Sequence, residues 1–109
     1  MSRWTVEVIP KAEREIKALP EDLQARFLHV SEMLEELGPR QVGEPHVKQL
    51  RGRLWEMRLK GRGGIARAVY FAAAGGRLVV VRAFVKKTRK TPGREVDLAM
   101  QRVKGLRIG

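Results

Sequence analysis

The sequence predicts an α+β fold in which a helical hairpin and a C-terminal helix pack on an antiparallel sheet. Two segments near the N-terminus carry apolar residues at helical spacing, and three segments in the second half alternate or run continuously apolar. Short glycine-rich turns separate these later segments, which indicates an antiparallel meander. The predicted order is strand, helix, helix, strand, strand, strand, helix, in one domain over residues 1–109.

The first half is predicted to hold a strand and a helical hairpin. Residues 4–9 alternate bulky apolar and polar side chains, and Pro10 ends this strand and starts a helix over residues 10–19. A second helix runs from Glu21 until Gly38 and Pro39 terminate it. Its apolar stripe follows a 3-4-3-4 spacing through Leu23, Phe27, Val30, Leu34 and Leu37. Residues 38–53 are rich in glycine and proline without periodicity, so we expect a long connection there.

Three strands and a last helix are predicted in the second half. Residues 54–60 alternate between an apolar face, with Trp55, Met57 and Leu59, and a charged face, with Glu56, Arg58 and Lys60. The next strand, residues 65–72, has Arg67 in the middle of an apolar run. The third, residues 77–85, is almost continuously apolar, which is typical of a strand covered on both faces. Thr91 and Pro92 predict the helix start, with Thr91 as N-cap.

The positive charge of the chain is concentrated in one block. The net charge is +11, and residues 51–94 contain 13 Lys or Arg and one acid, Glu56. The usual partner of such a field is a polyanion or an acidic protein. Cysteine is absent, which excludes a disulfide framework and a zinc knuckle. No apolar run reaches the roughly 20 residues that span a membrane. We therefore expect a soluble cytoplasmic protein without a membrane partner.

The densest positive stretch runs from Phe84 to Pro92, between the last strand and the last helix. Four of its nine residues are Lys or Arg, and none is an acid. We predict that this stretch forms one wall of an RNA-binding site and that the strands supply the other. Arg58 and Arg67 are expected side by side on the charged face if their strands are in register. The predicted RNA contacts are Lys60, Arg82, Lys86, Arg89 and Lys90.

The residues available for chemistry favour charge stabilisation. The sequence has no Ser-His-Asp set, no pair of carboxylates in one segment, no phosphate-binding loop and a poor choice of metal ligands. What remains is stabilisation of a phosphoryl transfer in which RNA supplies its own 2′-hydroxyl nucleophile. The predicted catalytic residues are Arg58, Arg67, Lys87 and Glu56, without metal or cofactor. Glu56 could act as a base or form a salt bridge on the strand, and a lysine among like charges could move the proton.

Three segments carry a family resemblance: Val47–Arg58, Ala66–Phe71 and Phe84–Pro92. They contain the patterns Leu-Trp-Glu-x-Arg and Phe-x-Lys-Lys-Thr-x-Lys-Thr-Pro. With these patterns the chain resembles the RelE/HigB superfamily of bacterial and phage toxins. It is most similar to the phage-derived HigB-like branch of that superfamily. The resemblance extends over nearly the whole chain. It implies a RelE-like fold and a type II toxin that cleaves mRNA in the ribosomal A site without a metal.

The same resemblance implies partners and residue roles. The antitoxin is expected to be small, in this branch usually a helix-turn-helix protein, and operator DNA to be bound only through the complex. Arg58 matches the family's basic residue on the strand after the long loop, and Arg67 its arginine on the next strand. Lys86 and Lys87 match its basic cluster, with Arg89 and Lys90 beyond. Several RelE-type members carry a tyrosine or histidine near the C-terminal end, and the segment after Pro92 has neither, so the proton-transfer groups stay unassigned.

Three functions remain open from the sequence. The first is a ribosome-dependent mRNA endoribonuclease toxin that inhibits translation. The second is a toxin of the same fold that inhibits DNA gyrase. The third is a non-catalytic RNA- or ribosome-binding protein. Arg67 in the middle of a hydrophobic strand, together with Arg58, favours the first over the second, because a buried guanidinium is costly unless it faces an anion or an acid.

Overall fold

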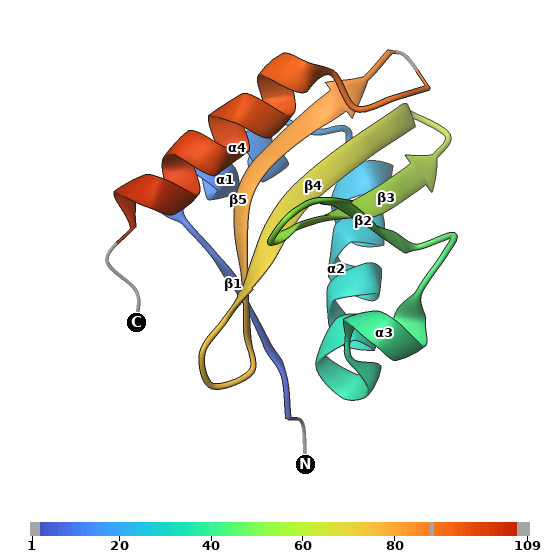
Figure 1. Cartoon of the computed structure of the whole chain (residues 1–109). Helices are drawn as coiled ribbons and strands as arrows, with labels where there is room; N and C mark the ends of the chain where they lie inside the picture. Colours follow the sequence, from blue (N-terminus) through green and yellow to red (C-terminus); the bar gives the residue numbers. More distant parts are fainter. Residues whose placement is uncertain (1–2, 88, 107–109) are drawn as a thin grey trace.

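The apolar faces predicted from the sequence are buried on the two sides of one five-stranded sheet (Figure 1). The computed structural model describes residues 3–87 and 89–106. The elements are β1 (Thr5–Val8), α1 (Pro10–Lys17), α2 (Glu21–Leu37), α3 (Pro39–Val42), β2 (Val47–Arg51), β3 (Leu54–Gly61), β4 (Gly64–Ala73), β5 (Arg77–Lys86) and α4 (Gly93–Gly105). No helix within the described ranges is long and apolar enough to cross a membrane.

The sheet has the strand order β1-β5-β4-β3-β2. Strands β3 to β5 form the predicted antiparallel meander, joined by short turns, and β2 adds an antiparallel edge strand beside β3. Strand β1 pairs in parallel with β5, with Thr5 opposite Arg77. The first and last strands are therefore neighbours, and β5 is an inner strand, as its continuous apolar pattern predicted.

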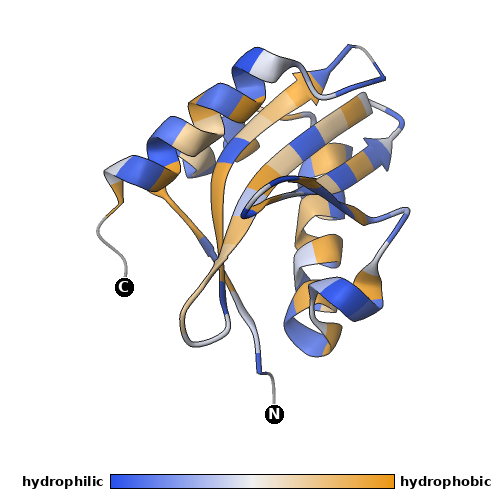
Figure 2. Ribbon diagram, in the orientation of Figure 1, coloured by the Kyte–Doolittle hydropathy of each residue, from blue (hydrophilic) through white to orange (hydrophobic). Residues whose placement is uncertain are grey.

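Two layers of helix cover the two faces of the sheet. Helices α1 and α2 bury their stripes against Met57, Leu59 and Tyr70. Helix α4 packs its Val96 and Ala99 against a second cluster on the opposite face, over β4 and β5. Figure 2 shows hydrophilic residues interrupting the largely hydrophobic β4 and β5. Because α4 lies over only part of its face (Figure 1), the same face of β3 and β2 stays open.

The prediction of a long unstructured connection over residues 38–53 was wrong. This segment contains the short helix α3 and the edge strand β2. Val47 is buried in the core under the hairpin, and β2 pairs with β3 so that Lys48 lies opposite Glu56. The glycines and prolines that obscured the periodicity stand at the ends of these short elements. Gly38, at φ 83°, precedes α3, and Gly52, at φ 56°, lies in the turn between β2 and β3.

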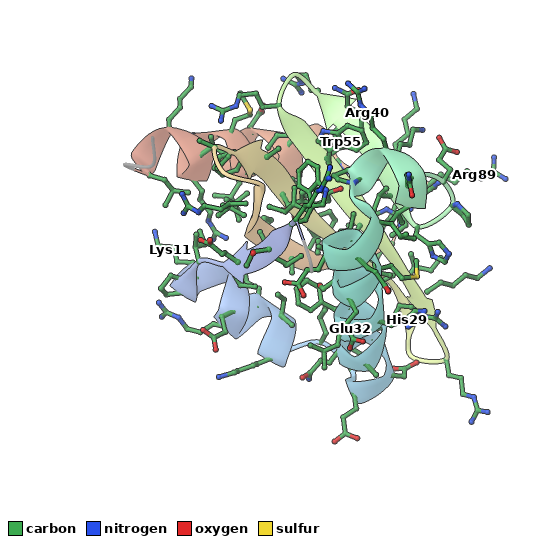
Figure 3. The ribbon with its side chains drawn as sticks, turned by 90° about the horizontal axis from the view of Figure 1, so that it is seen from below. Lys11, His29, Glu32, Arg40, Trp55 and Arg89 are labelled. Carbon is green, nitrogen blue, oxygen red and sulfur yellow. The ribbon has the colours of Figure 1, made fainter. Side chains whose placement is uncertain are left out.

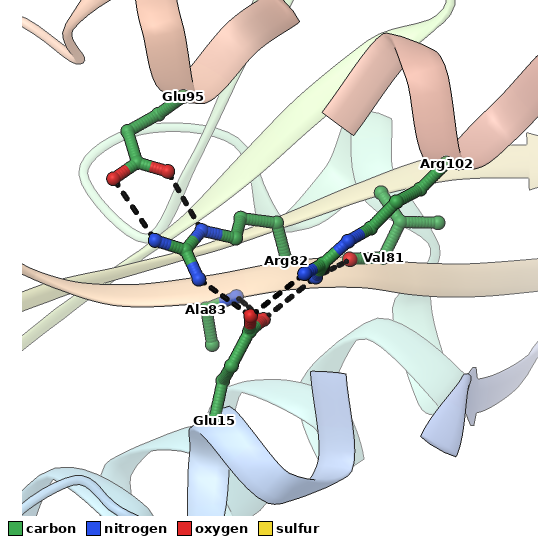
Figure 4. A network of polar contacts seen from close by, with 6 residues as sticks. All are labelled: Glu15, Val81, Arg82, Ala83, Glu95 and Arg102. Atoms are coloured by element: carbon green, nitrogen blue, oxygen red, sulfur yellow. Dashed lines mark hydrogen bonds and ion pairs between the residues drawn. The ribbon is translucent and has the colours of Figure 1, made fainter. Parts of the chain in front are cut away.

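The last helix begins one residue later than predicted, at Gly93, with Pro92 rather than Thr91 at its N-cap. An ion-pair network holds this helix to the rest of the fold (Figure 4). Both carboxylate oxygens of Glu15, on α1, accept hydrogen bonds of 2.9 Å from Arg102 of α4. Arg82 of β5 donates to Glu15 at 2.5 Å and to Glu95 of α4 at 2.6 and 3.0 Å.

Glu15 also completes the edge of β5. Strand β1 reaches only Val80, and beyond it the N–H of Ala83 donates to Glu15 at 3.1 Å. Burial raises the pKa of Glu15, but hydrogen bonds from Arg102, the Ala83 amide and Arg82 outweigh burial and leave the pKa below its ordinary value of 4.5. One carboxylate thus joins α1, β5 and α4.

Glu15→Gln is expected to lower the free energy of unfolding at pH 7 by about 2 kcal/mol, because four charge-assisted hydrogen bonds are weakened. Since the pKa is depressed on folding, this stability is present above the unfolded pKa of about 4.5 and is lost as the pH falls through the folded pKa. Urea unfolding from pH 7 to pH 3 measures both effects. Glu13→Gln, at an exposed surface pair with Lys17, is the control. Equal effects of the two substitutions at pH 7 would contradict the assignment.

Candidate functional site

Arg58 of β3 and Arg67 of β4 lie directly opposite each other in the antiparallel register. The alternation of both strands puts them on the face that α4 covers only in part. Arg58 is half-buried, whereas Arg67 is only 4% exposed. Like charges directly opposite each other destabilise a sheet. The protein therefore holds two guanidinium groups together at a cost to its own stability.

Glu56 offsets part of this cost through a buried ion pair with Arg67. The Nε atom of Arg67 lies 3.4 Å from Oε2 of Glu56, and each side chain is 5% exposed. This geometry is an ion pair rather than a hydrogen bond, since Nε has no hydrogen-bond partner among the described residues. Burial lowers the pKa of Arg67, Glu56 raises it and Arg58 lowers it again, with a net downward shift.

Arg67 keeps hydrogen-bonding capacity in spite of its burial. Among the described residues its guanidinium donates one hydrogen bond, from Nη1 to the carbonyl of Ala66 at 3.3 Å. A guanidinium has five N–H donors, and buried donors are normally satisfied. Arg67 therefore has donors left for an external acceptor.

Thr91 ties the positive stretch after β5 to the sheet. Its hydroxyl donates a 2.5 Å hydrogen bond to Oε1 of Glu56, instead of capping α4. Glu56 thus contacts Arg67 with one oxygen and Thr91 with the other. These contacts favour the salt-bridge interpretation of Glu56 over a role as general base, because a base needs a free lone pair facing the substrate.

The stretch from Lys86 to Thr91, which we call the basic loop, stands above the open face. The ammonium group of Lys86 donates to the carbonyl of Arg89, which folds the loop back on itself. Burial lowers the pKa of Lys86, and the nearby Arg67 lowers it further. Lys87, Arg89 and Lys90 are exposed, and Figure 3 shows Arg89 extending outward at the rim of the molecule. Thr88, part of the family-like motif, lies outside the described residues.

Two hollows flank Arg58. The first, which we call the loop hollow, lies between β2, β3 and the basic loop, and its walls include Lys48, Glu56, Arg58, Arg89, Lys90 and Thr91. The second, which we call the helix hollow, is lined by Arg26 of α2, by Pro45 and His46 before β2, by Arg58 and Lys60 of β3, and by Ile65 and Arg67 of β4. Arg58 lines both hollows, and Arg67 lines the second. The predicted Lys60, Arg89 and Lys90 are therefore gathered around Arg58.

Arg82 is placed differently from the other predicted RNA contacts. Its guanidinium is held by Glu15 and Glu95, and it lies 5.6 Å from the ring centroid of Phe84. These contacts give Arg82 a structural role in docking α4. Lys87 lines neither hollow, so its catalytic role stays a prediction.

Sequence reasoning missed two cations at the site. Lys48 was missed because β2 was taken as a connection, although Val47 and Lys48 already showed one apolar and one polar position. Arg26 was missed because it lies on α2, off the apolar stripe and far from β3 in the sequence. Within the described residues, no group of three or more His, Asp or Glu side chains is arranged to hold a metal ion.

Glu56→Ala and Arg67→Ala are each expected to lower the free energy of unfolding by about 3 kcal/mol, because each leaves its partner charge buried and unpaired. The double variant should lose less than the sum of the two single losses. Urea unfolding of the four proteins measures this coupling. Strictly additive losses would show that the two side chains do not depend on each other.

Comparisons with known proteins agree with this architecture. A family model described as "Phage derived protein Gp49-like (DUF891)" matches residues 14–104. No curated protein matches the chain. The fold is similar to that of a chain in the crystal structure of the archaeal RelE-RelB complex from Pyrococcus horikoshii OT3, with a TM-score of 0.58 and 22% identity, over 81% of this chain and 99% of the other. The chain therefore belongs to the phage-derived Gp49-like family, the HigB-like branch that its motifs indicated, and has the RelE-like fold.

Proposed function

We propose that the chain is the toxin of a type II toxin–antitoxin pair and that it cleaves mRNA on the ribosome by metal-independent phosphoryl transfer. One observation carries the proposal: Arg58 and Arg67 lie opposite each other on an open cationic face, and Arg67 has unused donors. Membership of the Gp49-like family and the RelE-like fold support the same class of function.

The reaction needs few dedicated catalytic groups. The 2′-oxygen of one ribose attacks the adjacent phosphorus, the bond from phosphorus to the 5′-oxygen breaks, and the products are a 2′,3′-cyclic phosphate and a 5′-hydroxyl. The negative charge that develops on the non-bridging oxygens would lie against Arg58 and Arg67, whose planar groups donate hydrogen bonds in pairs. Holding the strand bent in line would supply much of the remaining acceleration.

The proton that leaves the 2′-hydroxyl and the proton that joins the 5′-oxygen need carriers. We assign this role to Lys86, which lies opposite Ile65 in the sheet, two residues from Arg67 along β4, and whose pKa is lowered by burial and by Arg67. Glu56 has both oxygens engaged and acts instead by holding Arg67 and Thr91 in place. Lys87, Arg89 and Lys90 would grip the RNA backbone from the exposed side of the loop.

The open face also suits a protein partner that neutralises the toxin. The similar structure is that of a RelE-RelB complex. We infer that a small antitoxin covers the cationic face of this chain and blocks access of RNA. In the HigB-like branch this antitoxin would be of the helix-turn-helix type, and operator DNA would be bound only through the complex.

Primer extension on cellular mRNA after brief induction tests the proposal. Discrete breaks within codons are expected. A DNA-damage response without mRNA breaks would replace the proposal with gyrase inhibition. Growth inhibition with neither response would indicate a non-catalytic RNA- or ribosome-binding protein.

Arg58→Ala is expected to reduce the rate of mRNA cleavage about a hundredfold and to relieve growth arrest, because it removes one of the two charges facing the phosphate. Arg58 suits this test better than Arg67, since its side chain has no ion pair or hydrogen bond with the described residues. Arg62→Ala, which removes an exposed charge from the β3–β4 turn, is the control. If a folded Arg58→Ala protein cleaved mRNA at the wild-type rate, Arg58 would not be a residue of the catalytic site.

The basic loop is expected to act in binding. Replacing Lys87, Arg89 and Lys90 by alanine should weaken binding of single-stranded RNA and flatten its salt dependence, by about 0.7 in the log–log slope for each phosphate that is no longer neutralised. Fluorescence anisotropy with a 2′-O-methyl RNA at several salt concentrations measures this slope. An unchanged slope would mean that the loop does not contact the RNA backbone.

A further inference from the structure

We propose that the helix hollow is a second phosphate subsite, which binds the RNA phosphate next to the one at Arg58. The inference rests on the proposed function and deepens it, because it assigns a role to Arg26 of α2. The loop hollow and the helix hollow share Arg58. A strand whose reacting phosphate lies at Arg58 would therefore place its neighbouring phosphate beside Arg26 and Lys60.

Three of the four Lys and Arg side chains that line the helix hollow are unpaired within the described residues. Among the described residues, Arg26, Arg58 and Lys60 have no carboxylate within ion-pair distance, and no acid lines the hollow. The partly buried Arg82 and Arg102, by contrast, share Glu15 at 2.5 and 2.9 Å. Several cations gathered around one hollow that no acid lines favour an anion from outside.

The hollow is also lined by a buried group that needs an acceptor. Arg67 contributes to the wall, and its Nε atom is buried without a hydrogen bond among the described residues. A phosphate in the helix hollow would accept charge-assisted hydrogen bonds from Arg26 and Lys60, and from those donors of Arg58 and Arg67 that the reacting phosphate leaves unused.

The position of Arg26 is fixed by the scaffold. Four residues earlier on α2, Asp22 accepts a 2.6 Å hydrogen bond from the N–H of Gly63 in the β3–β4 turn. A Cβ atom at Gly63 would lie 2.6 Å from Oδ1 of Asp22 and 2.8 Å from Cβ of Pro20, so a larger residue would force the turn and α2 apart. The turn that carries Lys60 and Ile65 at its two ends is therefore fastened to the first part of α2.

The opposite wall is fixed as well, because the N–H of Arg58 donates to the carbonyl of His46 at 2.7 Å. Ile65, which is 40% exposed, adds an apolar surface to the hollow. A ribose or base edge could pack on it while its phosphate contacts the arginines. This mix of cations and one apolar wall suits a nucleotide unit better than an acidic peptide side chain, since a carboxylate would leave Ile65 uncovered.

Two non-cleavable 2′-O-methyl RNAs test the subsite: a dinucleotide with one phosphate and a tetranucleotide with three. Arg26→Ala is expected to weaken binding of the tetranucleotide about tenfold and to lower its salt slope by about 0.7, with little effect on the dinucleotide. Arg26→Lys should restore the slope. Equal weakening of both RNAs, or of neither, would overturn the inference.

Arg40→Ala is the matched control. Arg40 is an exposed arginine on α3, beside Trp55 in Figure 3 and outside both hollows. An equal loss of RNA binding with Arg40→Ala would show that the effect of Arg26→Ala comes only from the lower net charge of the protein, and would overturn the subsite. Weakened binding of a co-expressed antitoxin without weakened RNA binding would assign Arg26 to a protein partner instead. Arg26 is exposed, so circular dichroism should show an unchanged fold.

Cleavage kinetics separate this inference from the proposed function. On ribosome-bound mRNA, Arg26→Ala should raise KM with kcat retained, because Arg26 would hold its phosphate equally well in the ground and transition states. A fall in kcat equal to the fall in kcat/KM would make Arg26 part of the reacting centre and overturn the subsite. If the wild-type chain does not cleave mRNA, the proposed function fails, and the two oligonucleotide titrations still decide whether the helix hollow binds phosphate.

Discussion

The buried ion pair between Glu56 and Arg67 is the interaction on which the open face depends. It lets a guanidinium remain charged in the middle of a hydrophobic strand, where burial alone would disfavour the charge. One carboxylate does not satisfy all the donors of Arg67, and Arg58 lies directly opposite. Glu56 offsets enough of the charge of Arg67 for the protein to fold with this side chain buried. The two guanidinium groups together still attract an anion.

The same carboxylate positions the basic loop. Thr91 reaches Glu56 from one end of the loop, and Arg82, four residues before the end of β5, binds Glu95 at the start of α4. The loop is thus anchored on both sides, while Arg89 and Lys90 stay exposed between the anchors. Lysines on a flexible segment would also bind a polyanion. An anchored loop, in contrast, keeps its charges at a constant place relative to Arg58. That constancy is what a reaction with a defined geometry requires.

The sequence predicted those features that depend on neighbouring residues and missed those that depend on distant ones. Period-two alternation was enough to put Glu56 and Arg58 on one face, and short turns were enough to bring Arg67 beside them. The edge strand β2 was missed because its five residues lie between glycines and prolines that obscure any period. Thr91 matched the pattern of an N-cap, and nothing local could reveal that Glu56 competes for its hydroxyl. Arg26 reaches the site only because α2 packs across the sheet.

The arrangement has a thermodynamic consequence for the partner. Arg26, Arg58 and Lys60 line one hollow that no acid lines, and Arg58 lies directly opposite Arg67, an arrangement of like charges that disfavours the free folded chain. Any acidic molecule that binds the folded state and not the unfolded chain relieves this repulsion and stabilises the fold by mass action. An antitoxin that covers the cationic face would therefore inhibit and stabilise the chain through the same contacts. When that antitoxin is removed, the exposed cationic face would attract RNA.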